Sequence, residues 1–96
     1  MEIFQRGELA IFTVNFKDED GNAIQPTDVY AYIYEESILY TYGEADYLGQ
    51  TGEFEYRWEI PIGVNRGIWH IDFQAVYAEE DILERNEFKI KHSGLD

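Results

Sequence analysis

The sequence has no cysteine, two prolines and a single methionine. Without cysteine, the chain forms no disulfide and offers neither a thiolate metal ligand nor a cysteine nucleophile. No stretch approaches the ~18 consecutive apolar residues of a membrane-spanning helix. The first residues also lack the basic segment followed by an apolar one that marks a signal peptide. We therefore expect a small protein that is made in the cytoplasm, either complete or a domain of a larger one, with a core stabilised by packing.

Basic residues are scarce. Seven Lys and Arg stand against 20 Asp and Glu, which gives a formal net charge of -13. Nucleic-acid-binding proteins place Lys and Arg against phosphates, so this balance argues against nucleic acid as a partner. It also opposes binding to anionic membranes. Because like copies repel each other, self-association has to use a weakly charged surface.

Apolar residues are plentiful for a chain of this length, at 45% hydrophobic and 17% aromatic. We expect residues 1–96 to form one domain with one core. The clearest pattern lies between residues 53 and 60, where aromatic and apolar side chains alternate strictly with charged ones. Residues 69–75 alternate in the same way around Trp69. Period-2 alternation of this kind indicates half-buried β-strands.

Further alternating segments fill most of the remaining chain. They cover residues 9–16, 29–34 and 87–91, and residues 38–42 with 46–50 suggest a hairpin about Gly43, Glu44 and Ala45. Turn-forming residues separate the segments, and no window shows a helical stripe. About seven short strands with this spacing predict an all-β fold, an immunoglobulin-like antiparallel β-sandwich.

The order of these signals resembles a known family. The features that carry the resemblance are Gly7 before an alternating strand, the turn at residues 18–22, residues 26–29, residues 52–56, Ile60 with Pro61, and residues 67–69. Together they resemble a common prokaryotic and phage immunoglobulin-like domain, with related patterns in bacterial surface repeats and macroglobulin-like domains. The chain departs from shorter members in its longer, tyrosine-rich middle, from Glu35 to Gln50.

The resemblance implies a function as well as a fold. Members of this family are usually non-enzymatic spacers, decorations or adhesive modules, and small stand-alone members resemble virion head or tail components. We therefore expect a structural or protein-interaction module, with a virion as a candidate location. Because many functions share this fold, the resemblance specifies the sandwich better than the activity.

Catalytic groups are poorly represented. The only serines are Ser37 and Ser93, and His92 beside Ser93 lies near the chain end, so a serine triad is not expected. His70 and Asp72 share one strand face, where either a solvated histidine or a metal or acid–base site fits the pattern. Acidic pairs are too common in this chain to indicate glycoside hydrolysis. We expect no enzyme activity.

Calcium is the one ion that the sequence suggests. The carboxylates of residues 18–22 begin like an EF-hand loop, but that loop needs glycine at its sixth position and glutamate at its twelfth. Here those positions hold Ala23 and Val29. We expect no cofactor, and leave open a plain Asp-Gly turn or a looser calcium site at the turn carboxylates.

The most distinctive candidate surface is aromatic. Val29, Ala31 and Ile33 alternate with three tyrosines, so an inward-facing apolar row leaves the tyrosines outside. In an immunoglobulin-type sandwich this strand pairs with the Trp69 strand, and the last strand lies beyond it. The predicted binding face consists of Tyr30, Tyr32, Tyr34, His70, Asp72, Gln74, Lys89 and Lys91.

Three interpretations of this face remain open. Tyrosine suits protein interfaces because it gives a large contact area at low entropic cost. The same rings suit stacking against sugars, which makes a carbohydrate-binding module the alternative function. The third interpretation is that cross-strand tyrosines only support an exposed sheet. We expect a protein partner or self-association, with carbohydrate as the second choice.

Overall fold

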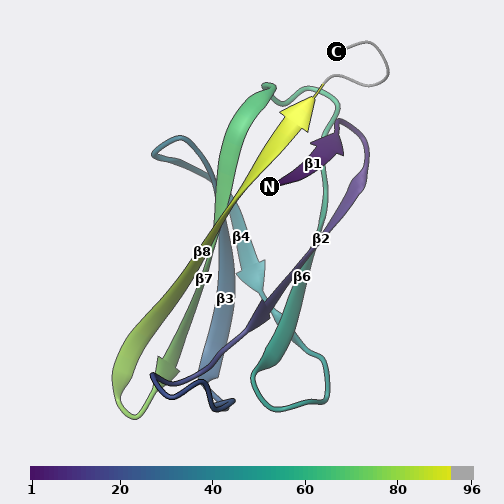
Figure 1. Ribbon diagram of the computed structural model, residues 1–96. Helices are drawn as coiled ribbons and strands as arrows, with labels where there is room; N and C mark the ends of the chain where they lie inside the picture. The colour runs from purple at the N-terminus through teal and green to yellow at the C-terminus, as the bar shows by residue number, and fades with distance from the viewer. Residues whose placement is uncertain (92–96) are drawn as a thin grey trace.

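The computed structural model describes residues 1–91, and these form β-strands joined by short turns (Figure 1). None of the described residues belongs to a helix with the length and apolarity needed to cross a bilayer. The strands are β1 (Glu2–Gln5), β2 (Leu9–Asn15), β3 (Thr27–Glu35), β4 (Ile38–Glu44), β5 (Asp46–Tyr47), β6 (Glu53–Glu59), β7 (Gly67–Tyr77) and β8 (Glu80–Lys91).

The strands form two packed sheets. One sheet has five strands in the order β1-β8-β7-β3-β4, and the other has three in the order β2-β6-β5. The series β8-β7-β3 matches strands G, F and C of an immunoglobulin domain, and β2-β6-β5 matches B, E and D. The predicted fold class, an all-β immunoglobulin-like sandwich, is confirmed. The short strand β1 brings the number of strands to eight.

One pairing differs from the expected antiparallel pattern. β1 pairs with β8 in parallel, from Glu2 opposite Phe88 to Gln5 opposite Lys91. At Gly7 the chain then turns into the other sheet, and the Gly7 amide donates to the carbonyl of Ile60 over 2.7 Å. The first strand therefore lies in the five-stranded sheet, while β2 lies in the three-stranded one.

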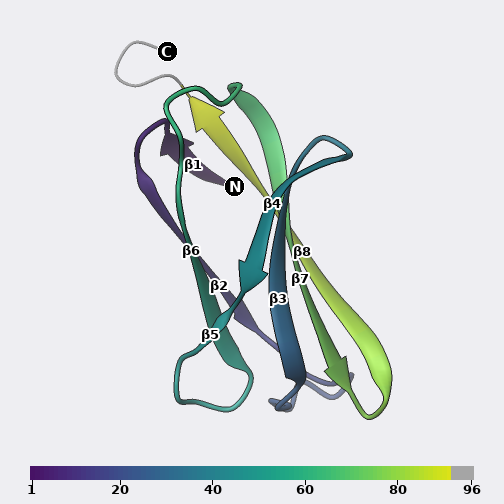
Figure 2. The same ribbon diagram turned by 180° about the vertical axis from the view of Figure 1, so that it is seen from behind.

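The predicted hairpin of residues 38–42 with 46–50 is wrong. β4 pairs with β3, and β5 pairs with β6 in the other sheet. The chain crosses between sheets at Ala45, which is buried and donates its amide to the carbonyl of Val29 over 2.9 Å. Figure 2 shows β4 passing directly into β5. The glycine signal at Gly43 thus marks a crossing between sheets.

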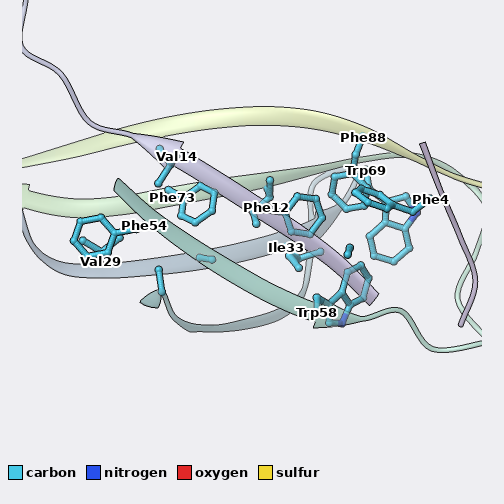
Figure 3. Packing of buried hydrophobic residues seen from close by; sticks show 14 of the residues in the cluster. Phe4, Phe12, Val14, Val29, Ile33, Phe54, Trp58, Trp69, Phe73 and Phe88 are labelled. Atoms are coloured by element: carbon cyan, nitrogen blue, oxygen red, sulfur yellow. The ribbon is translucent and has the colours of Figure 1, made fainter. Parts of the chain in front are cut away.

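Aromatic side chains from both sheets meet in the core (Figure 3). Trp58 of β6 and Trp69 of β7 lie with ring centroids 5.7 Å apart. Phe12 and Phe88 lie 4.8 Å apart, also across the sandwich. Residues 54–60 and 69–75 point their predicted apolar faces into this core, as their alternation requires. Without disulfides, these contacts are the main stabilising contribution.

Two positions require glycine because neighbouring atoms leave no room for a Cβ atom. At Gly52, φ is +82° and an added Cβ would lie 2.7 Å from the carbonyl oxygen of Phe16, so no other residue fits. At Gly43, an added Cβ would lie 2.9 Å from the Tyr56 ring. The Tyr56 side chain packs against the core there, and burial raises the pKa of its hydroxyl.

Candidate binding face

The pairing of β3 with β7 determines which side chains share the outer surface of the five-stranded sheet. The apolar row of β3 is buried, so the tyrosines between its members point away from the core. β7 supplies the residues directly opposite. The resulting pairs are Tyr30 with Gln74, Tyr32 with Asp72, and Tyr34 with His70. Six of the eight predicted residues are therefore neighbours on one surface.

Two ring stacks order this surface. Tyr34 and His70 stack with centroids 4.7 Å apart and planes 16° apart. Tyr32 stacks on Tyr42 of β4 at 5.6 Å and 17°. Stacking restricts the rings before any partner arrives, which lowers the entropic cost of binding. Tyr42 was not in the predicted set, because the sequence suggested that β4 pairs elsewhere.

A buried charge lies beneath the rings. Asp72 is only 2% exposed although it belongs to the outer row of β7. Arg85 of β8 holds both of its oxygens, with Nε–Oδ1 at 2.7 Å and Nη2–Oδ2 at 2.8 Å. These hydrogen bonds, together with the charge of Asp72, raise the pKa of Arg85. A bidentate pair of this kind is rigid and directional.

We call this surface the tyrosine face. It consists of Tyr30, Tyr32, Tyr34, Tyr42, His70, Asp72, Gln74 and Arg85. Arg85 escaped prediction because the β7–β8 register depends on the turn at Ala78 and Glu79. Both turn residues have positive φ, at 52° and 65°. That conformation usually requires Asn or Gly, so the sequence gives no signal for this hairpin register.

Lys89 and Lys91 lie on the same outer surface but beyond the tyrosines. Lys89 pairs with Ile68 on β7 and with Ile3 on β1, and Lys91 pairs with Gln5. They border an open hollow of about 570 Å³ that also includes Ile3 and Arg66. Both lysines lie on the last strand, beyond the Trp69 strand, as the expected strand order places them, and their part in the binding face stays a prediction.

Both apolar and charged side chains surround the tyrosine face. Leu39, Ile68 and Leu83 are exposed around it. Glu44 and Glu87 lie at its margins, opposite Tyr30 and His70 respectively. The outer face of β6 differs, because it presents Glu53, Glu55 and Glu59 with a single arginine. The two faces of the sandwich therefore offer different chemistry.

The geometry at His70 and Asp72 does not favour acid–base chemistry. The Asp72 carboxylate is engaged by Arg85, and the His70 ring lies against Tyr34. A small hollow between β2 and β8 measures about 20 Å³, room for roughly one water molecule. Ser37 is exposed on the β3–β4 turn, whereas Ser93 and His92 lie outside the described residues.

In the turn at residues 18–22, the first carboxylate accepts hydrogen bonds from backbone amides of the same turn. The Asp18 Oδ1 atom accepts hydrogen bonds from the amides of Asp20 and Asn22, both at 2.9 Å. The Gly21 amide donates to the carbonyl of Asp18 at 3.0 Å. These are the contacts of an Asx-type turn. Within residues 1–91, no three His, Asp or Glu side chains are grouped as metal ligands.

Comparison with known proteins does not extend this description. A scan against protein-family models matches no family, and a search of curated proteins finds no similar sequence. The fold and the chemistry of its surfaces therefore carry the functional argument.

Proposed function

We propose that the protein is a non-enzymatic interaction module that binds a protein partner through the tyrosine face. The observation that carries this proposal is the exposure of ordered tyrosines on a rigid sheet. Tyr42 is 61% exposed and Tyr30 is 37% exposed, while their neighbours Tyr32 and Tyr34 are half-buried. Large aromatic side chains at the centre of an interface contribute most of the binding energy in many complexes.

The charge distribution supports a protein partner. Twenty acidic residues give the molecule a strong negative field, yet the centre of the tyrosine face has one acidic side chain, and Arg85 neutralises it. A partner that docks there avoids much of the repulsion that it would meet over the glutamates of β6. Arg85 adds a partly exposed guanidinium beside the rings, a residue type that is enriched at interfaces.

The resemblance to phage and bacterial immunoglobulin-like domains adds a setting to this proposal. In that setting the module would be a virion head or tail component that docks on a neighbouring protein of the particle. A second candidate function, carbohydrate binding, draws on the parallel rings of Tyr32 and Tyr42, which resemble a stacking platform. Sugar binding would use the open side of Tyr42.

The test compares two tyrosine variants on opposite sheets. Tyr42→Ser removes an exposed ring from the tyrosine face, and Tyr47→Ser removes a similarly exposed ring, at 52%, from β5. Candidate partners would be purified virion proteins and a panel of oligosaccharides, and affinity would be measured by calorimetry. We expect Tyr42→Ser to weaken binding about 30-fold, the effect of a central interface tyrosine, and Tyr47→Ser to change it less than about twofold.

Each outcome has a clear meaning. A protein that binds with this pattern supports the proposal, and an oligosaccharide that does so establishes the carbohydrate alternative. Partners that bind both variants as tightly as the unaltered protein would contradict a role for the tyrosine face.

A further inference from the structure

Unpaired strand edges are the second feature of this sandwich with a functional implication. An edge presents backbone N–H and C=O groups that can pair with another strand, and proteins usually protect such edges with charges, proline, bulges or short length. The free edges among residues 1–91 belong to β1, β4, β5, β2, the part of β6 that β5 does not cover and the part of β8 that β1 does not cover.

The edges other than that of β2 are protected. β1 has only four residues, one of them Glu2, and the part of β6 that β5 leaves uncovered carries Arg57 and Glu59. The free part of β8 is highly charged, with Asp81, Glu84 and Glu87 among its residues. β5 has only two residues, one of them Asp46. In β4 the register shifts so that Tyr40 is an extra residue opposite β3, which makes a bulge.

β2 has none of these protections. Its seven residues, Leu9–Asn15, include no charge, no proline and no glycine. Its pairing with β6 runs without a register shift from Leu9 to Asn15. In a constant-type immunoglobulin domain, strand A covers this edge of strand B. Here β1 pairs with β8 instead, so no strand of residues 1–91 pairs with the outer edge of β2.

The direction of the backbone groups follows from the hydrogen bonds at the two ends of β2. The Ile60 amide donates to the carbonyl of Glu8, and the Phe16 amide donates to the carbonyl of Gly52, each over 2.9 Å. Even-numbered residues therefore bond towards β6. In an antiparallel ladder the alternate residues point the other way. The amides and carbonyls at the free edge belong to Leu9, Ile11, Thr13 and Asn15.

We propose that this edge pairs with β2 of a second copy of the chain, antiparallel and across a two-fold axis near Phe12. In that register Leu9 meets Asn15 and Ile11 meets Thr13, so outward-pointing backbone groups face one another. The two three-stranded sheets become one continuous sheet. This proposal concerns the sheet opposite the tyrosine face, and so it is independent of the proposed function.

The uncharged side chains of β2 make a second copy a feasible occupant. Two molecules of net charge -13 repel, and pairing is feasible only where neither brings charge to the contact. Each side-chain pair in the proposed register is uncharged on both sides. Leu9 and Ile11 are also exposed, at 44% and 40%, and would be partly covered by the partner strand. Residual repulsion between the molecules predicts that added salt strengthens the dimer.

The test uses Thr13, whose amide points to the free edge. Thr13→Pro removes that amide without removing a hydrogen bond to β6, and proline is tolerated at such edge positions. Thr13→Ala is the matched control, because it keeps the amide. Solution mass would be measured by analytical ultracentrifugation up to about 1 mM protein, which detects dimers with dissociation constants up to about that value. We expect a dimer for the unaltered chain and for Thr13→Ala, and a dissociation constant raised at least about tenfold for Thr13→Pro.

A second pair of variants tests the proposal independently, in case Thr13→Pro does not fold. Ile11→Lys adds charge to the exposed face of β2 and should abolish the dimer, whereas Tyr42→Lys adds the same charge to the tyrosine face and should leave it intact. Hydrogen exchange gives an independent readout. Amides of Leu9, Ile11, Thr13 and Asn15 should become protected as protein concentration rises, while the even-numbered amides between them are protected throughout.

Three results would overturn the proposal. The first is a monomer at every concentration in moderate salt. The second is a dimer that Tyr42→Lys disrupts and Ile11→Lys does not, which would place the contact on the tyrosine face. The third is a dimer in which the odd-numbered amides of β2 exchange as fast as in the monomer, which would indicate another protein surface as the contact.

Discussion

At the scale of single residues, Gly52 shows how closely the end of β2 is joined to the start of β6. Its amide donates to the Gln25 side chain over 2.9 Å, and its carbonyl accepts from Phe16. The carbonyls of Phe16 and Ile24 lie so close that an added Cβ would be within 2.8 Å of both. The glycine that precedes the aromatic strand therefore serves two requirements, a positive φ and contact with backbone atoms.

A pair of alanine variants separates these two requirements. Gly49 has a similar φ of +91° but nothing within 4 Å of an added Cβ. Gly49→Ala should cost about 1 kcal/mol in the free energy of unfolding, from backbone strain alone. Gly52→Ala should cost about 3 kcal/mol, since the backbone must also move. Urea denaturation would measure the free energy of unfolding of both variants. Equal losses of stability would show that the close contact at Gly52 does not affect stability.

At the scale of strands, alternation predicted side-chain direction well. The inward rows of β3, β6 and β7 and the outward tyrosines follow from period-2 spacing, which local sequence records directly. Pairing between distant strands was less accessible. Arg85 was missed because the Ala78–Glu79 turn has no characteristic sequence. The crossing at Ala45 looked like a hairpin because glycine serves both structures.

The Asp72–Arg85 pair links β7 to β8 and supports the tyrosine face from below. Arg85→Leu leaves the buried carboxylate without its cation, and we expect a fall of several degrees in Tm. Changing both residues, Asp72→Leu with Arg85→Leu, should restore much of that loss, because no charge remains buried. Thermal unfolding followed by circular dichroism measures the unaltered protein, the single variants Asp72→Leu and Arg85→Leu, and the double variant. If the double variant is less stable by the sum of the two single losses, the pair is not coupled.

At the scale of the whole molecule, net charge is the dominant property. The sandwich measures 45 × 25 × 22 Å and carries a net charge of -13 on a surface where cations are few. The acidic residues of β6 lie on one face, and several of the basic residues lie on the other along β8. Repulsion among the acidic side chains opposes the compact state and is screened by salt.

This repulsion predicts that salt stabilises the fold. Raising NaCl from about 10 mM to about 150 mM shortens the screening distance roughly fourfold, and Tm should rise by a few degrees. The measurement belongs at a protein concentration low enough to keep the chain monomeric, so that dimerisation does not contribute. A Tm that stays constant or falls with added NaCl would mean that favourable ion pairs, such as Arg57 with Glu55, outweigh the repulsion.

The parallel pairing of the first and last strands has a mechanical consequence. If force were applied between the start of β1 and the end of β8, the two strands would be drawn past each other along their length. The hydrogen bonds from Glu2 to Gln5 would then share the load and have to fail together, whereas strands peeled from one end fail one bond at a time. A strand of four residues, anchored in the core by Phe4, would thus set the resistance of the whole domain to stretching.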